Sequence, residues 1–144
     1  MRLKQSEILI VDCQATGANP QKGHLIEIGW MQCRPDQNGT LTSTACNAHL
    51  IRLPEDVHIP KRVERVTGIL SQDLSASIDL ADAWSLMFET AQKTALANGT
   101  SHCPTIIHFA RYETPFLRFL HHRFSPDAPF PFEIICTQIG RAHV

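Results

Sequence analysis

The sequence predicts an α/β protein in which helices flank a mixed five-stranded β-sheet. Three runs of apolar and β-branched residues come first in the chain, and two helical patterns then alternate with two further apolar runs. Strands that come before a helix–strand–helix–strand series are typical of a sheet with both antiparallel and parallel neighbours. The chain has 144 residues, of which 43% are hydrophobic, so it suits one domain with one core.

The first three strands are expected to form an antiparallel meander. Their apolar runs place them at residues 7–14, 25–33 and 45–53. A polar turn over 34–40 separates the second strand from the third, and its Asn38-Gly39 pair is a strong hairpin signal. Because these links are short, the strands that they join are expected to run in opposite directions.

Helices and two further strands complete the predicted fold. Pro60 opens a short helix, which Gly68 ends. In the longest helix, apolar residues recur at steps of three and four, which indicates a face packed on the core, with a partner-binding face as the alternative. The expected bounds are 60–66, 77–97 and 113–124 for the helices, and 105–109 and 132–136 for the strands. The last helix is expected to turn Phe116, Phe119 and Leu120 inward.

Composition limits the classes of function. The formal net charge is −1 with neutral histidines, so no basic field marks a nucleic-acid binder that works by charge alone. The five cysteines form no C-x-x-C pair and the histidines lack zinc-finger spacing, which argues against a structural zinc site and favours a reducing cytoplasm. We therefore expect a cytoplasmic protein without a membrane partner, since the sequence offers neither a signal peptide nor a membrane-spanning stretch.

A chemical signal lies at the end of the first strand. Asp12 and Gln14 are two residues apart, so their side chains point to the same face of the strand. Two oxygen-bearing side chains at one strand end can share a hard cation, because Mg²⁺ takes one or two protein oxygens together with substrate phosphates. Thr16 and Gly17 then turn the chain. The alternative interpretation is a buried strand that ends in an Asp-capped turn.

Residues 8–29 resemble the first motif of the DnaQ-like (DEDD) 3′→5′ exonucleases, of the ribonuclease T and DNA polymerase III epsilon type. The family pattern D-x-E-T-T-G, followed by I-I-E-I-G, is matched here by D-C-Q-A-T-G at 12–17 and L-I-E-I-G at 25–29. Gln14 is neutral where the family has its second carboxylate. The resemblance implies a ribonuclease H-like fold.

A second stretch, residues 107–117, resembles the family's second motif, H-N-A-x-F-D-x-x-F-L. The residues that match in register are His108, Ala110, Tyr112, Phe116 and Leu117. Glu113 stands where the family has aspartate, and Phe109 replaces asparagine. Glu113 lies in the first turn of the expected helix, where the helix dipole favours an acidic group, so a capping role is the alternative to metal binding. His108 is expected to be a buried, hydrogen-bonded core histidine rather than a base.

The resemblance implies phosphodiester hydrolysis with two Mg²⁺ or Mn²⁺ ions. Asp12 would bridge both ions, Gln14 would offer a carbonyl oxygen to the first, and Glu113 would hold the second. The segment from Ile59-Pro60 to Thr67-Gly68-Ile69 resembles the family's linking segment, which lines the pocket for the 3′-terminal nucleotide. The residues expected to contact a single-stranded 3′ end are Ala15, Thr16, Gly17, Thr67, Phe109 and Arg111. For Arg111, a solvated surface charge is the alternative.

The family's third motif, H-x-x-x-x-D or Y-x-x-x-D, is not found at its family position, which comes after a further helix. After Glu113 the carboxylates are Asp127 and Glu133. His122 has the H-x-x-x-x-D spacing to Asp127, but this pair lies at the end of the expected helix 113–124, before the last expected strand. We therefore expect an incomplete exonuclease domain over 1–137, truncated at its C-terminal end. The last seven residues, 138–144, match what a common short-read sequencing adapter encodes when translated, so they are expected to be non-native.

Two hypotheses follow from these motifs. The first is the N-terminal part of a 3′→5′ exonuclease, inactive or nearly so in this form, with a polymerase or a further domain downstream as an expected partner. The second is a catalytically degenerate nucleic-acid-binding module, because Gln14 removes one ligand charge. The sequence leaves open whether the nucleic acid is DNA or RNA.

Overall fold

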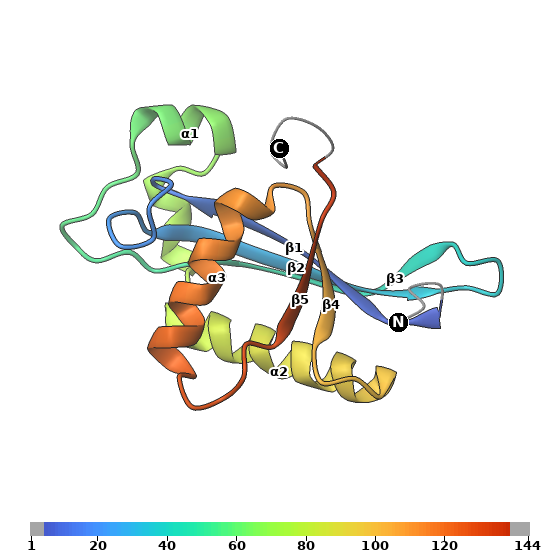
Figure 1. Ribbon diagram of the computed structural model, residues 1–144. Coiled ribbons are helices and arrows are strands. Elements are labelled where there is room, and N and C mark those ends of the chain that lie inside the picture. Colours follow the sequence, from blue (N-terminus) through green and yellow to red (C-terminus); the bar gives the residue numbers. More distant parts are fainter. Residues whose placement is uncertain (1–4, 139–144) are drawn as a thin grey trace.

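The computed structural model describes residues 5–138. Its five strands form one sheet in the order β3-β2-β1-β4-β5 (Figure 1). The strands are β1 (Ile8–Ala15), β2 (Leu25–Pro35), β3 (Leu41–Leu50), β4 (Cys103–Ile107) and β5 (Phe132–Cys136). The first three pair antiparallel, whereas β4 runs parallel to β1 and β5 runs parallel to β4. The predicted mixed five-stranded sheet, with its antiparallel meander, is confirmed.

The helices lie in the two connections from β3 to β4 and from β4 to β5. They are α1 (Lys61–Thr67), the 3₁₀ helix η2 (Ser71–Ala76), α2 (Leu80–Asn98) and α3 (Ala110–Phe124). Figure 1 shows α2 and α3 packed against the same face of the sheet. Within residues 5–138, no helix is long and apolar enough to cross a membrane.

The main core lies between that face and the two long helices. Trp84 and Met87 of α2 and Phe116, Leu117 and Leu120 of α3 are all at most 2% exposed, so the predicted apolar face of the long helix packs inward. Phe119, also predicted to point inward, is half-buried against the same cluster. A second, smaller cluster of isoleucines holds α1 and η2 to the start of β2. It consists of Ile26, Ile59 and Ile69, with Leu50, Leu53, Val63 and Leu74 packed around it.

β1 divides its side chains between this core and the opposite face. Leu9, Val11, Cys13 and Ala15 are buried in the core cluster. The residues between them point the other way, because successive side chains of a strand alternate between its two faces. Asp12, the fifth residue of the strand, is exposed on that opposite face. The strand therefore anchors itself in the core with every second residue, and near its end the residues between, Asp12 and Gln14, are polar.

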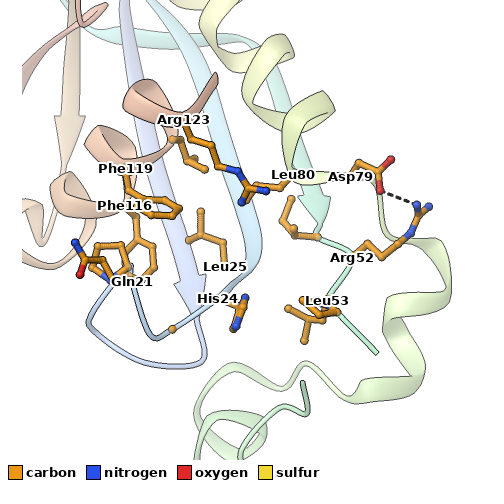
Figure 2. A pocket seen from close by; sticks show the side chains of 15 residues that line it. Gln21, His24, Leu25, Arg52, Leu53, Asp79, Leu80, Phe116, Phe119 and Arg123 are labelled. Atoms are coloured by element: carbon orange, nitrogen blue, oxygen red, sulfur yellow. Dashed lines mark hydrogen bonds and ion pairs between the residues drawn. The ribbon is translucent and has the colours of Figure 1, made fainter. Parts of the chain in front are cut away.

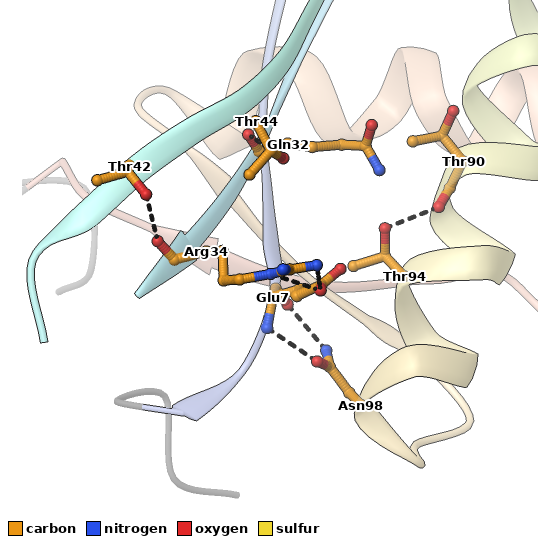
Figure 3. A network of polar contacts seen from close by, with 8 residues as sticks. All are labelled: Glu7, Gln32, Arg34, Thr42, Thr44, Thr90, Thr94 and Asn98. Carbon is orange, nitrogen blue, oxygen red and sulfur yellow. Dashed lines mark hydrogen bonds and ion pairs between the residues drawn. The ribbon is translucent and has the colours of Figure 1, made fainter. Parts of the chain in front are cut away.

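A polar network fixes the start of β1 to the far end of α2 (Figure 3). The Asn98 carboxamide makes two bonds to the backbone of Glu7: it accepts from the Glu7 N–H at 2.8 Å and donates to the Glu7 carbonyl at 2.8 Å. The Arg34 guanidinium of β2 donates from Nε to the Glu7 carboxylate at 2.9 Å. These contacts hold the sheet and α2 in a fixed relation at the end of the molecule far from the β1–β2 loop.

The expected boundaries differ from the structure in several places. α2 begins at Leu80 and not at residue 77, α3 begins at Ala110 and not at 113, and β3 ends at Leu50 and not at 53. β3 begins at Leu41 and not at residue 45, because Thr42 and Thr44 extend the ladder and donate hydroxyl hydrogen bonds to β2 carbonyls. The short helix η2 was not predicted, and the Asp73 carboxylate stabilises it by accepting the Leu70 N–H at 2.7 Å. β4 spans Cys103–Ile107, two residues earlier than expected.

The earlier end of β4 overturns the prediction for His108. The backbone N–H of Thr137 donates to the Ile107 carbonyl at 3.1 Å, and the chain then turns into α3. His108 therefore lies after the strand, in an exposed position, and is not a buried core histidine. Its ring Nδ1 lies 3.2 Å from the Thr137 hydroxyl.

Candidate functional site

A cavity of about 700 Å³ opens where β1 ends and α3 begins. The end of β1 and its following turn, helix α1 and the first turn of α3 form its walls. Eight of the nine residues predicted to form the site line it: Asp12, Gln14, Ala15, Thr16, Gly17, Thr67, Phe109 and Glu113. The ninth, Arg111, is exposed on α3 outside this lining, so the structure does not bring it to the others.

Asp12 and Gln14 meet as the alternation of β1 requires. The Gln14 carboxamide donates from Nε2 to the Asp12 Oδ2 at 3.3 Å. Both side chains line the cavity, with Asp12 exposed and Gln14 half-buried. This contact places the two side chains near enough to share a ligand, and it occupies one carboxylate oxygen with a neutral donor.

Glu113 is the buried acid of the site. It is 4% exposed in the first turn of α3, and its Oε2 has no hydrogen-bond donor. Burial, and to a smaller extent the facing Asp12 carboxylate, raise the pKa of its carboxyl to about 8, while the Cys13 backbone N–H acts in the opposite direction. The groups that interact most strongly with the Glu113 carboxyl therefore lie on β1. A capping role would instead require partners on its own helix, α3. In the metal-free protein, Glu113 is therefore mostly protonated at pH 7.

The donor set at this point suits a hard divalent cation. When both are ionised, the exposed Asp12 carboxylate and the buried Glu113 carboxylate, whose Oε2 has no hydrogen-bond donor, repel each other and are stabilised by a positive charge between them. An amide oxygen such as that of Gln14 is also a hard ligand. Within residues 5–138, no group of three or more His, Cys, Asp or Glu side chains gathers as a metal site.

The rim of the cavity is apolar and aromatic. The rings of Phe109 and Tyr112 lie parallel, with centroids 6.1 Å apart and an angle of 6° between their planes. Phe109 is 41% exposed, and Val66 of α1, across the cavity, is 78% exposed. The Tyr112 hydroxyl donates to the Gly17 carbonyl at 3.4 Å, which links α3 to the turn after β1. The exposed Phe109 ring is a flat surface on which a base can stack.

Two predicted contact residues already use their hydroxyls within the protein. Thr67 donates to the Val63 carbonyl at 2.8 Å and accepts from the Ile69 N–H at 3.1 Å. The Thr16 hydroxyl accepts from the His24 N–H at 2.9 Å. Both residues shape the wall of the cavity. The Thr67 hydroxyl is bonded as donor and as acceptor, whereas the bond at Thr16 uses its hydroxyl only as an acceptor.

Among the other lining residues, which the sequence did not assign to the site, two have basic side chains. Arg62, exposed on α1, brings the cavity a positive charge, and His108 lies at the edge beside α3. The signal for Arg62 was its place two residues after Pro60, in the segment that resembles the family's pocket wall. The signal for His108 was its match to the second motif. It was not assigned to the site because it was expected to be a buried core residue.

A second cavity, of about 390 Å³, lies between the β1–β2 loop, the end of β3 and the helices α2 and α3 (Figure 2). Its floor is apolar, with Leu25, Leu80 and Phe116 among the lining residues. An ion pair between Arg52 and Asp79, 2.6 Å long, lies at its edge. None of the residues predicted to form the site lines this cavity.

Similarity of this chain to known proteins is found among solved structures. No family model matches the sequence, and no curated protein matches it. Solved structures do match: Escherichia coli exonuclease I in complex with a dT13 oligonucleotide superposes on 92% of this chain with a TM-score of 0.71 and 13% sequence identity. The chain shares the fold of exonuclease I. The zinc-bound form of the E. coli exonuclease I–ssDNA complex and a product-bound exonuclease I give the same score and identity.

The predicted ribonuclease H-like fold is thereby confirmed, since the mixed sheet and its flanking helices match the exonuclease domain of these proteins. The chain spans 28% to 30% of the length of the exonuclease I chains that it matches. At 13% identity the likeness concerns the fold, and the chemistry must be argued from the residues of this chain.

Proposed function

We propose that this chain is part of a 3′→5′ exonuclease domain that binds the 3′ end of a DNA or RNA strand for phosphodiester hydrolysis, within the ribonuclease T and DNA polymerase III epsilon type. The observation that supports this most is the convergence of Asp12, Gln14 and the buried Glu113 on one cavity. That cavity lies at a strand end in a fold shared with exonuclease I, which has been solved with ssDNA.

Asp12 and Glu113 would hold Mg²⁺ or Mn²⁺ through their carboxylates, and Gln14 would add its amide oxygen. A bound divalent ion polarises the phosphate and lowers the pKa of the attacking water. Both carboxylates must be ionised to bind it, so cation binding is coupled to the loss of the proton that Glu113 holds in the metal-free protein.

The walls of the cavity would hold the nucleic acid. Phe109, backed by Tyr112, offers a stacking surface for a base, and the exposed Val66 limits the space opposite. Arg62 supplies a charge that can pair with a backbone phosphate. Because no third motif stands at its family position after a further helix, we expect the 144-residue polypeptide to bind such an end and to cleave it little or not at all.

The test is fluorescence anisotropy of a 5′-labelled oligo(dT) with the 144-residue protein, in Mg²⁺ and in EDTA. We expect Mg²⁺ to tighten binding, and we expect D12N and E113Q to lose that dependence. Asp127→Asn removes an exposed carboxylate elsewhere and serves as the matched control. Equal affinities in Mg²⁺ and EDTA would argue against the site. A parallel series with oligo(rU) separates DNA from RNA as the preferred strand.

The alternative, a catalytically degenerate binding module, is favoured by one observation. Gln14 adds no charge and donates to Asp12, so it competes with a cation for that carboxylate. Gln14→Glu should raise Mg²⁺ affinity about tenfold, roughly 1.4 kcal/mol, by adding a third carboxylate. In a protein that also carries the third motif, rising nuclease activity of Q14E would indicate a weakened native site, and falling activity would indicate a retuned one.

A further inference from the structure

β3 is a long edge strand without the usual protection against pairing. It has ten residues and lies at one end of the sheet order. Its first four residues are exposed, as are Cys46 and Ala48. The strand contains no Lys, Arg, Asp, Glu or Pro, which are the residues that natural edge strands use to prevent pairing with another chain.

The opposite edge of the same sheet is built differently. β5 has only five residues, and an exposed Glu133 is the second of them. Pro129 and Pro131 come just before it. Short length, charge and proline all disfavour further pairing, so β5 is a protected edge and β3 is not.

The outer backbone groups of β3 are covered at one end only. The 77–79 segment lies alongside the strand's last residue and the residues that follow it. The Ile78 N–H donates to the Leu50 carbonyl at 2.9 Å, and the Ile78 carbonyl accepts the Arg52 N–H at 2.9 Å. The hydroxyls of Thr42 and Thr44 are turned inward, to carbonyls of β2. Figure 1 shows the β2–β3 hairpin extending beyond the helices, so its outer side is open to another strand.

We propose that β3 is an interface at which two copies of this chain pair antiparallel through residues 41–48. Two identical uncharged strands meet without like-charge repulsion, whereas a charged partner would find no complementary charge on β3. Eight residues on each side allow about eight inter-strand hydrogen bonds, within the range of a typical interface. The pairing is self-complementary and closed, as a two-fold dimer requires, and it joins the two sheets into one.

The test is the molar mass in solution, measured by light scattering after size-exclusion chromatography from low to high micromolar concentration. We expect twice the 16.1 kDa of the chain, with dissociation on dilution. A double variant, S43K with T44K, places two like charges on each copy and should be monomeric. Leu96→Lys, at a position of α2 that is 80% exposed, adds a charge away from β3 and should stay dimeric.

Two further readouts keep the result decisive. Circular dichroism checks that the double variant remains folded, and if it does not, Ser43→Lys alone is used. Hydrogen exchange should show residues 41–48 protected in the wild type at high concentration and exchanging faster in the folded lysine variant. A monomeric wild type, an assembly larger than a dimer, or a dimer that survives the lysines would overturn the proposal. These outcomes do not depend on nuclease or metal chemistry.

Discussion

Replacing Glu113 with glutamine should stabilise the metal-free protein at neutral pH, although it removes a group from the candidate site. Glutamine has nearly the shape of a protonated glutamic acid and cannot ionise. In the folded protein, burial and the Asp12 carboxylate raise the pKa of Glu113 to about 8, from an ordinary value of 4.5. The native carboxyl therefore opposes folding once the solution pH is high enough to ionise it in the unfolded chain.

The direction and size of the effect follow from these two pKa values. Below pH 4.5 the carboxyl is protonated in both states, so wild type and variant should have similar stabilities. Between pH 4.5 and 8 the unfolded chain loses the proton while the folded protein keeps it, and the wild type loses about 1.4 kcal/mol per pH unit. At pH 7 the variant should therefore be more stable by about 3 kcal/mol, and the difference levels off above pH 8.

Urea denaturation in EDTA at a series of pH values measures this difference directly. Glu133→Gln, at an exposed position of β5, is the matched control and should show no such trend. Mg²⁺ should favour the wild type, because only the wild type binds it with two carboxylates. The gain is about 2.7 kcal/mol at 100 times Kd, which nearly cancels the difference at pH 7, and about 4.1 kcal/mol at 1,000 times Kd, which reverses the order. Equal stabilities of wild type and E113Q from pH 4.5 to 8 would refute the reasoning on burial and charge.

Three other substitutions test the supports of the site. Trp84→Phe loses the 2.9 Å bond from the indole N–H to Ser125 and leaves a void in the core, so it should cost about 2 kcal/mol in urea denaturation. Asn98→Ala removes both 2.8 Å bonds to the Glu7 backbone and should also cost about 2 kcal/mol, with faster hydrogen exchange at the start of β1. Gly23→Ala would place Cβ 2.8 Å from the Gly17 carbonyl, so we expect a lower Tm and weaker Mg²⁺-dependent oligonucleotide binding.

Much of the fold was predictable because its signals are local. The apolar run before Asp12 and the Asn38-Gly39 turn fix β1 and the β2–β3 hairpin from a few neighbouring residues each. The early part of β3 and the helix η2 were missed because no local signal marks them. Thr42 and Thr44 gain their strand geometry from pairing with β2, a contact that no local pattern in the sequence reports.

The candidate site was predictable to the extent that the motifs carry it. Strand alternation predicted that Asp12 and Gln14 would share a face. The structure places Glu113 in the same cavity, although it comes about a hundred residues later in the chain. The burial of Glu113 was not predictable from local pattern, because the residue lies in the first turn of a helix. His108 was misjudged because the strand was extended two residues too far, and the ligand and contact roles stay predictions.

The alternation of β1 means that site and core are interleaved residue by residue. Cys13 and Ala15 are buried in the core, and this packing fixes the positions of the neighbouring polar side chains, Asp12 and Gln14. A saturation library of residues 12–15 would therefore alternate. Substitutions at Cys13 and Ala15 would fail through misfolding and could be rescued by lower temperature, whereas those at Asp12 and Gln14 would fold normally and change only ligand binding. Such a map would separate the scaffold from the chemistry within a single strand.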